Sequence, residues 1–230
     1  MSETRETGIE ALLRLRRSTR GYLPDAVPRA DVERILQAAR RAPSGANLQP
    51  GRFHALSGAP LEALRRELVA ASQAGREIVS EYSYFPLQMG EALKAKQRAA
   101  GYALYAALGI AKRDLAGRRA QFDRNYAFFD APVGIVVTID RAMGKGCFMD
   151  MGMALMALQL AATDLGYGCC GIGALANYGD LVAEHLGLPS GEMVVCGLAL
   201  GRADPQAAVN GFETARDPLE EFAQFHGFED

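Results

Sequence analysis

The segment 148–165 is apolar on every side of the helix that its composition predicts. Such a helix has to be buried all round, and in a chain of 230 residues an interface between two subunits is a natural place for it. Continuous apolar runs at Val133–Ile139 and Met193–Leu200 predict two buried strands near it. The core is therefore expected to combine buried strands with this helix.

Shorter periodic stretches add further elements before and after this core. Apolar residues at helical spacing predict helices near 9–13, 32–39, 61–68 and 178–186, and strand-like runs lie at 52–57 and 167–171. Pro28 suits the start of the second helix, and Gly187 followed by Pro189 suits the end of the last one. Without internal repeats or low-complexity tracts, the pattern predicts one α+β domain over residues 1–230.

The segment from about 80 to 126 differs in character, because tyrosines and phenylalanines alternate there with lysines and arginines. It is expected to be a helical insertion on the surface. Two interpretations have equal support: an ordinary amphipathic helix pair, or a lid whose aromatic side chains face a ligand.

Composition excludes several classes of partner. The 25 basic and 27 acidic residues leave no charge excess that would favour nucleic acid or an anionic membrane. The longest apolar stretches, such as Val133–Ile139 and Met193–Leu200, are far shorter than the about 20 residues that a membrane-spanning helix needs, so no membrane span is expected. The first ten residues lack a signal-peptide core. The four cysteines lack zinc-site spacing, and the neighbours Cys169 and Cys170 would point to opposite faces of a strand. A cytoplasmic protein with reduced cysteines and no metal site is expected.

Hydrolytic and nucleotide-hydrolysing mechanisms lack the residues they need. The three histidines stand in no nucleophile motif, and the chain has neither a phosphate loop ending in Lys-Ser or Lys-Thr nor a G-x-G-x-x-G fingerprint. Anion binding and glycine-rich backbone remain as the candidate chemistry.

Three segments carry that chemistry. In an extended segment Arg16, Ser18 and Arg20 lie on one side and suit a phosphate dianion, although these arginines could equally cap a helix C-terminus. The turn 42–50 offers hydroxyl, amide and backbone groups that match the polar edge of a flavin or its ribityl chain. In segment 168–174, glycines let the backbone approach a flat ring, or simply form a tight turn.

In this order and at these separations, the segments resemble the nitroreductase family over essentially the whole chain. The resemblance rests on Arg16–Arg20, Pro43–Pro50, Gly171–Gly173 and, in the tail, Asn210 with Arg216–Leu219. Residues 101–132 resemble the lid of the nitrobenzoate reductase branch. The resemblance implies a nitroreductase-like α+β fold, with a central mixed or antiparallel sheet flanked by helices and a helical lid, in a homodimer whose chains wrap around each other.

The family pattern also implies an FMN site shared between two subunits. Arg16, Arg17, Ser18, Arg20 and Arg216 would hold the phosphate and ribityl of FMN, while Pro43, Ser44, Gly45 and Asn47 would come from the partner subunit. The backbone of Gly171, Ile172 and Gly173 would lie beside the ring, with an amide able to hydrogen-bond to N5.

By the same resemblance the reaction is a ping-pong exchange, in which NAD(P)H reduces the flavin and a small flat oxidant then takes the hydride. The flavin N5 carries the hydride, so no catalytic side chain is expected. The plausible walls for an aromatic substrate are Tyr82, Tyr84, Tyr126, Phe128 and Phe129.

Two departures and several alternatives accompany this interpretation. Gly51 stands where family members commonly have tryptophan, and Gly171–Ala174 stands where the branch with the most similar lid often has Pro-Gln. A reductive dehalogenase of the iodotyrosine deiodinase type shares the fold, as does a flavin-destroying enzyme. From other classes, a non-catalytic flavin-binding protein or a cofactor-free interaction domain would also fit.

Overall fold

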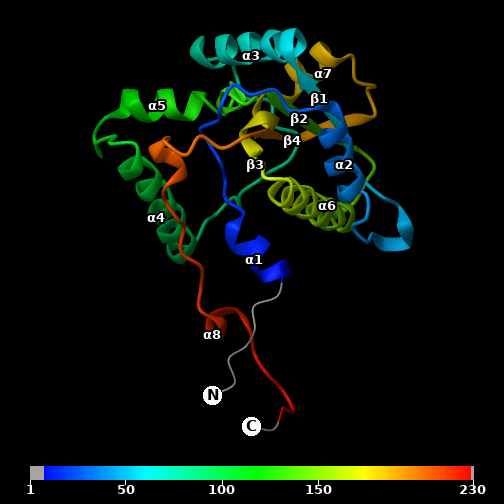
Figure 1. Ribbon diagram of the computed structural model, residues 1–230, viewed down its shortest axis with the longest axis vertical. Coiled ribbons are helices and arrows are strands. Elements are labelled where there is room, and N and C mark those ends of the chain that lie inside the picture. The colour runs from blue at the N-terminus through cyan, green and yellow to red at the C-terminus, as the bar shows by residue number, and fades with distance from the viewer. Residues whose placement is uncertain (1–7, 229–230) are drawn as a thin grey trace.

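The computed structural model describes residues 8–228 and is built around an antiparallel sheet (Figure 1). Its strands are β1 (Arg52–Ser57), β2 (Val133–Asp140), β3 (Gly168–Ile172) and β4 (Glu192–Gly201), in the order β1-β2-β4-β3. Helices cover both faces, so β2 and β4 are buried along nearly their whole length. The predicted α+β class and the two buried strands are confirmed.

Four of the helices, α2 (Arg29–Ala39), α3 (Gly58–Gln73), α6 (Lys145–Asp164) and α7 (Gly179–Leu186), cover the two faces of the sheet. The others, in chain order, are α1 (Gly8–Leu15), α4 (Glu91–Ala107), α5 (Leu115–Asp123) and α8 (Leu219–Phe222). Short 3₁₀ turns lie at η1 (Gly45–Asn47), η2 (Phe128–Asp130), η3 (Gly173–Asn177) and η4 (Ala208–Asn210). One hydrophobic cluster joins α2 and α6 to one face, and a second joins α3 and α7 to the other.

A register shift in the β2–β4 pair changes which residues of β4 face each layer. The shift lies between Val137 and Thr138 of β2. On β4, Val195 and Leu198 pack on the α6 side although they are three positions apart, which strict alternation would forbid. The extra residue lets both ends of this long strand bury apolar side chains.

Two strand glycines open a slot for an aromatic ring on the α3 side of the sheet. A Cβ on Gly134 would lie 2.6 Å from Leu61 Cδ1 and 3.0 Å from the Phe128 ring, and one on Gly197 would lie 3.1 Å from the same ring. Phe128 is fully buried there. Both positions therefore need glycine, because the ring occupies the space of a side chain.

The apolar helix α6 is buried along one stripe only. Its inward residues are Met151, Ala154, Leu158 and Ala162, while Met149 is 71% exposed and Met153 is 42% exposed. By length and composition α6 could cross a membrane, and 22% of its most apolar stretch is buried within the chain. The expectation that no apolar segment has that length was wrong, because it considered only the strand runs.

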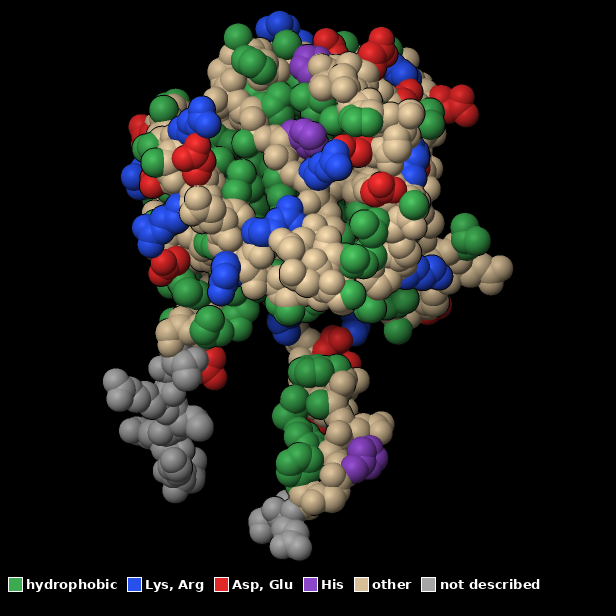
Figure 2. Space-filling model, turned by 90° about the vertical axis from the view of Figure 1, so that its right-hand side faces the viewer, with side chains coloured by type: hydrophobic (Ala, Val, Ile, Leu, Met, Phe, Trp, Pro, Cys, Tyr) green, Lys and Arg blue, Asp and Glu red, His purple; other side chains and the backbone are tan. Residues whose placement is uncertain are grey.

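Two parts of the chain lie outside the central layers. Helix α5 packs against α3, and α4 contacts η4 beside the body of the molecule. The tail after η4 extends away from the body through α8 (Figure 1), and Figure 2 shows it as an arm with hydrophobic side chains along it. Its exposed apolar residues are Leu219, Phe222, Phe225 and Phe228.

We expect Gly134→Ala to lower the free energy of unfolding by about 1–3 kcal/mol, because the new methyl group overpacks the slot against Leu61 and Phe128. Urea unfolding followed by circular dichroism measures this. Gly90→Ala is the matched control, since a Cβ there meets no atom within 4 Å. Equal stability of the two variants would show that the slot is not tightly packed.

Candidate functional site

The segment that follows α1 runs in extended form along the edge strand β3. Ser18 pairs with Cys169 in parallel, and the Thr19 amide donates to the Cys169 carbonyl at 3.1 Å. Thr19 is buried against Gly168, where a Cβ would lie 2.4 Å from the Thr19 hydroxyl oxygen. Ser18 and Arg20 therefore point away from the core on either side of a buried threonine, as the alternation in the sequence predicts.

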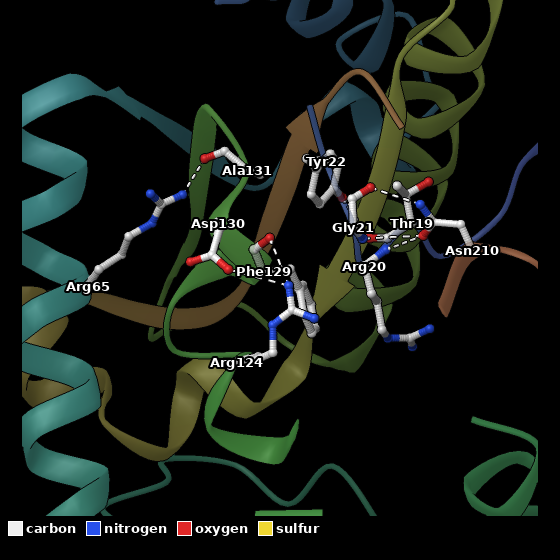
Figure 3. Close-up of polar contacts among 10 residues, drawn as sticks. All are labelled: Thr19, Arg20, Gly21, Tyr22, Arg65, Arg124, Phe129, Asp130, Ala131 and Asn210. Atoms are coloured by element: carbon white, nitrogen blue, oxygen red, sulfur yellow. Dashed lines mark hydrogen bonds and ion pairs between the residues drawn. The ribbon is translucent and has the colours of Figure 1, made fainter. Parts of the chain in front are cut away.

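The side chain of Asn210 fixes this segment to the C-terminal part of the chain. Its Oδ1 accepts from the Arg20 amide at 2.9 Å and from the Gly21 amide at 3.3 Å, and its Nδ2 donates to the Gly21 carbonyl at 2.8 Å (Figure 3). A Cβ on Gly21 would lie 2.5 Å from the Ala207 side chain. Two segments about 190 residues apart in sequence are held in register by one amide.

A pocket of about 410 Å³ opens where these segments meet α1 and α4. It is lined by Leu13, Arg14, Arg16, Arg17, Ser18, Arg20, Ala100, Gly101, Leu104, Val209, Asn210, Phe212, Glu213, Thr214 and Arg216. The structure thus brings together all five residues that the sequence assigns to phosphate and ribityl binding. Helix α4 closes one side of the pocket with Ala100, Gly101 and Leu104, and no aromatic residue of segment 80–126 is among the lining residues.

The pocket is strongly basic because only part of its positive charge is neutralised. Arg17 forms an ion pair with the Glu213 carboxylate. Arg20 Nη1 donates to the Ser18 carbonyl at 3.2 Å, and Arg216 Nη1 donates to the Thr214 hydroxyl at 2.7 Å. Arg16 faces the neutral Gln159 amide at 3.5 Å. Within residues 8–228, Arg16, Arg20 and Arg216 therefore bond to neutral oxygen atoms, which suits the capture of an anion.

The loop with Pro43, Ser44, Gly45 and Asn47 does not line this pocket. It lies beside α6, where the Gly45 amide donates to Asp150 Oδ2 at 3.0 Å. Ala46, Asn47 and Gln49 have positive φ, and the Ser44 hydroxyl accepts from the Gln49 amide at 2.9 Å. The loop thus has a defined and strained shape, yet within one chain it stands apart from the arginines.

Gly51, where the family commonly has tryptophan, has a local reason to be glycine. Its φ is +87°, and a Cβ would lie 3.3 Å from the Met151 side chain of α6. A left-handed backbone at this position disfavours any L side chain. Met151 fills the neighbouring space.

Gly171, Ile172 and Gly173 close β3 and begin η3. A Cβ on Gly171 would meet no atom within 4 Å, so this backbone is open on one side. A Cβ on Gly173 would lie 3.2 Å from the ring of Tyr84, which is 69% exposed. Ser18 pairs in parallel with Cys169 on the same strand, so the glycines follow β3 in the same direction as the chain after Ser18.

The five aromatic residues predicted to line a substrate site separate into two groups. Tyr82 and Tyr84 lie in the loop before α4, and Tyr82 donates from its hydroxyl to the Val195 carbonyl at 2.6 Å. Tyr126, Phe128 and Phe129 are buried in the cluster under α3. Within one chain these three side chains therefore face the core: η2 directs Phe128 and Phe129 inward, and Tyr126 is buried just before that turn.

Burial raises the pKa of the Tyr82 phenol to about 12, with smaller contributions from Cys196 and Tyr84. Burial also raises the pKa of the Cys169 and Cys170 thiols. These cysteines face opposite sides of the sheet in separate clusters, as expected for neighbours on a strand. They are neutral thiols at pH 7, which disfavours a redox role for the pair.

Sequence reasoning missed the positioning roles of Asn210 and Gln159. Asn210 belongs to the tail motif, but nothing in its neighbourhood indicates that it binds the Arg20–Gly21 backbone. Gln159 reaches Arg16 from the apolar helix α6. Gln159 is the single polar residue between Met151 and Ala162, and this is the signal that could have found it.

Comparison with known proteins supports the resemblance. The family model described as the nitroreductase family matches residues 13–202. The chain is 37% identical over 218 residues to the chloronitrobenzene nitroreductase of Comamonas testosteroni, covering 94% of this chain and 96% of that protein. It is 33% identical over 220 residues to the 4-nitrobenzoate reductase of Pseudomonas putida, covering 96% of both chains.

Solved structures agree with these matches. The FMN and NADPH-dependent nitroreductase NfnB from Sphigopyxis sp. strain HMH superposes with a TM-score of 0.93 at 37% identity, covering 96% of this chain and 100% of that one. The FMN-dependent nitroreductase NfnB from Mycobacterium smegmatis, in complex with NADPH, superposes with a TM-score of 0.90 at 30% identity, covering 95% and 97%.

We expect Asn210→Asp to destabilise the protein by about 1–2 kcal/mol at pH 7, because a carboxylate would face the carbonyls of Gly21 and Asp204 that the amide now donates to. Denaturant unfolding measures this. Asn125→Asp is the control, since that amide donates to a single carbonyl, of Phe122, in an exposed turn. A loss no larger than that of the control would show that Asn210 does not fix the segment.

Proposed function

The chain belongs to the nitroreductase family, and from this membership we propose that it is an FMN-dependent NAD(P)H oxidoreductase that reduces nitroaromatic compounds, quinones or similar flat oxidants. The observation that carries the proposal is the basic pocket, in which Arg16, Ser18, Arg20 and Arg216 meet. One of the similar solved structures is described as NADPH-dependent and the other is a complex with NADPH, which supports NADPH as the donor.

The donor set of the pocket fits the phosphate end of FMN. Three guanidinium groups without carboxylate partners among the described residues, together with the Ser18 hydroxyl, match a phosphate dianion in charge and in hydrogen-bond geometry. A volume of about 410 Å³ lies within the range of small-molecule sites. Gly171, Ile172 and Gly173, farther along β3, would then hold the ring and offer an amide to its N5.

When bound, FMN supplies the chemistry by accepting a hydride from NAD(P)H and passing it to the oxidant. The side chains bind and orient, so no acid–base pair is required. Tyr84 is exposed beside Gly173 and serves as a wall for a flat substrate. Tyr82 keeps its proton at neutral pH, because its pKa is about 12 and its hydroxyl is bound to Val195, and it acts as a wall rather than as a proton donor.

A homodimer with shared sites accounts for the surfaces that one chain leaves uncovered. The outer side of α6 exposes Met149 and Met153, and the arm exposes the phenylalanines Phe222 and Phe225. Apolar surface of this extent is typical of subunit interfaces. A partner subunit seated on α6 would also bring its own loop with Pro43, Ser44, Gly45 and Asn47 to complete the cofactor site.

The remaining features are consistent with one domain over residues 1–230 in the cytoplasm. The segment 80–126 contains α4 and α5 and forms the lid of that domain. All four cysteines are unpaired, as is usual in a reducing compartment.

The relatives that are 33–37% identical are named as a chloronitrobenzene nitroreductase and a 4-nitrobenzoate reductase, which favours nitroarene reduction over dehalogenation or a non-catalytic flavin-binding role.

We expect the purified protein to show the absorption bands of oxidised FMN, and the double variant Arg16→Ala/Arg216→Ala to lose them, because two of the phosphate-binding cations are gone. Arg29→Ala/Arg66→Ala removes the same charge outside the pocket and should stay yellow. Oxidation of NADPH with a nitroarene added tests turnover. A colourless wild type that also fails to take up added FMN would refute the proposed function.

We expect Met149→Glu/Met153→Glu to shift the protein from dimer to monomer and to release FMN, because two carboxylates would be placed on the apolar side of α6. Size-exclusion chromatography with light scattering measures the shift. Ala70→Glu, exposed on α3 across the sheet, is the control and should remain dimeric. A glutamate variant that stays dimeric would place the interface elsewhere.

A further inference from the structure

The turn η2 has an unusual backbone for a buried segment. Phe128, Phe129 and Asp130 are consecutive residues with φ of +50°, +53° and +63°. Phe128 and Phe129 are at most 1% exposed. Left-handed conformations are disfavoured for residues other than glycine, and three in succession persist only where the surroundings impose them.

Two arginines hold the turn in this shape. Arg124, directly after α5, donates from Nη2 to the Phe129 carbonyl at 3.4 Å and forms an ion pair with Asp130 at 3.3 Å (Figure 3). Arg65 of α3 donates to the Ala131 carbonyl. These contacts anchor the turn to the elements on either side of it.

The left-handed turn sends two neighbouring rings to different places. Phe128 fills the slot over Gly134 and Gly197 in the sheet. The Phe129 ring lies between two guanidinium groups, with Arg20 Cζ 5.8 Å and Arg124 Cζ 5.9 Å from its centroid. Both distances fall within the range of cation–π contacts.

We propose that Phe129 is a positioning residue that orients the Arg20 guanidinium toward the phosphate of FMN; this inference rests on the proposed function. The Arg20 backbone is fixed by Asn210, whereas the only hydrogen-bond partner of its long side chain among residues 8–228 is the Ser18 carbonyl. The buried ring supplies the second constraint. It accepts none of the guanidinium hydrogen bonds that a phosphate needs, so the cation is ordered before the anion arrives.

The same ring connects the cofactor site to the lid. Arg124 follows α5 directly, so the end of that helix and the phosphate-binding Arg20 share one aromatic partner. Substitution at Phe129 is therefore expected to change cofactor affinity from a position outside the residues that line the pocket.

The test compares Phe129→Met with Phe128→Met in the full-length protein. Methionine fills core space flexibly but lacks a ring, so both variants lose a buried aromatic while only the first loses the contact with Arg20. Titration of the flavin-stripped protein with FMN, followed by quenching of flavin fluorescence, gives Kd. We expect Kd to rise about 3- to 10-fold in Phe129→Met and to change less than about twofold in Phe128→Met.

A double-mutant cycle with Arg20→Ala separates positioning from general destabilisation. If the ring acts through Arg20, Phe129→Met raises Kd in the wild-type background but leaves Kd unchanged when Arg20 is already alanine. Equal effects in both backgrounds, or equal Kd for Phe129→Met and Phe128→Met, would overturn the inference. A wild type that binds no FMN would instead refute the proposed function.

Pentafluorophenylalanine at position 129 provides a second measurement that preserves the shape of the core, should the methionine variant not fold. Fluorine withdraws electron density from the face of the ring and weakens its attraction for a cation while its volume is nearly kept. We expect Kd to rise about 3-fold or more at position 129 and to stay unchanged at position 128. An unchanged Kd at position 129 would overturn the inference.

Discussion

The antiparallel pairing of β2 with β4 is the interaction on which the other layers depend. Both strands are buried on both faces, so each must supply apolar side chains to two hydrophobic clusters at once. The register shift beside Val137 lets β4 do so along its whole length. Gly134 and Gly197 then leave space for Phe128, which joins the turn before β2 to the sheet that the turn leads into.

The proposed cofactor site lies at the edge of that sheet. Strand β3 pairs with β4 on one side. On its other side, Cys169 of β3 forms a parallel bridge with Ser18, so the basic segment lies at the edge of the sheet. Asn210 binds the neighbouring backbone, and the turn η2 places Phe129 against Arg20. Arg20 is thus held by the neighbouring backbone pairing, by the Asn210 amide and by the buried Phe129 ring, and none of these contacts neutralises its charge.

Part of the apolar surface of α6 stays exposed because only one side of this helix packs on the sheet. One stripe of the helix covers the sheet, and no described element of the same chain covers the side that carries Met149 and Met153. The arm around Phe222 and Phe225 likewise lies away from its own body (Figure 1). In the dimer that we propose, a second subunit would cover both surfaces and would complete the cofactor site with the loop around Ser44.

The sequence by itself determined the α+β class, the buried strands, the apolar helix and the alternation that points Ser18 and Arg20 to the face opposite Thr19, because these follow from local periodicity. Only the tertiary structure decided the strand order and the contact of Asn210 with Arg20 across 190 residues. It also decided whether the aromatic side chains before β2 face a ligand or the core. Tyr126, Phe128 and Phe129 read as substrate walls in the sequence, since hydrophobicity alone does not distinguish a ligand-facing ring from a core ring. Three left-handed residues, held by Arg124 and Arg65, turn Phe128 and Phe129 inward, and no pattern of residue types encodes that backbone.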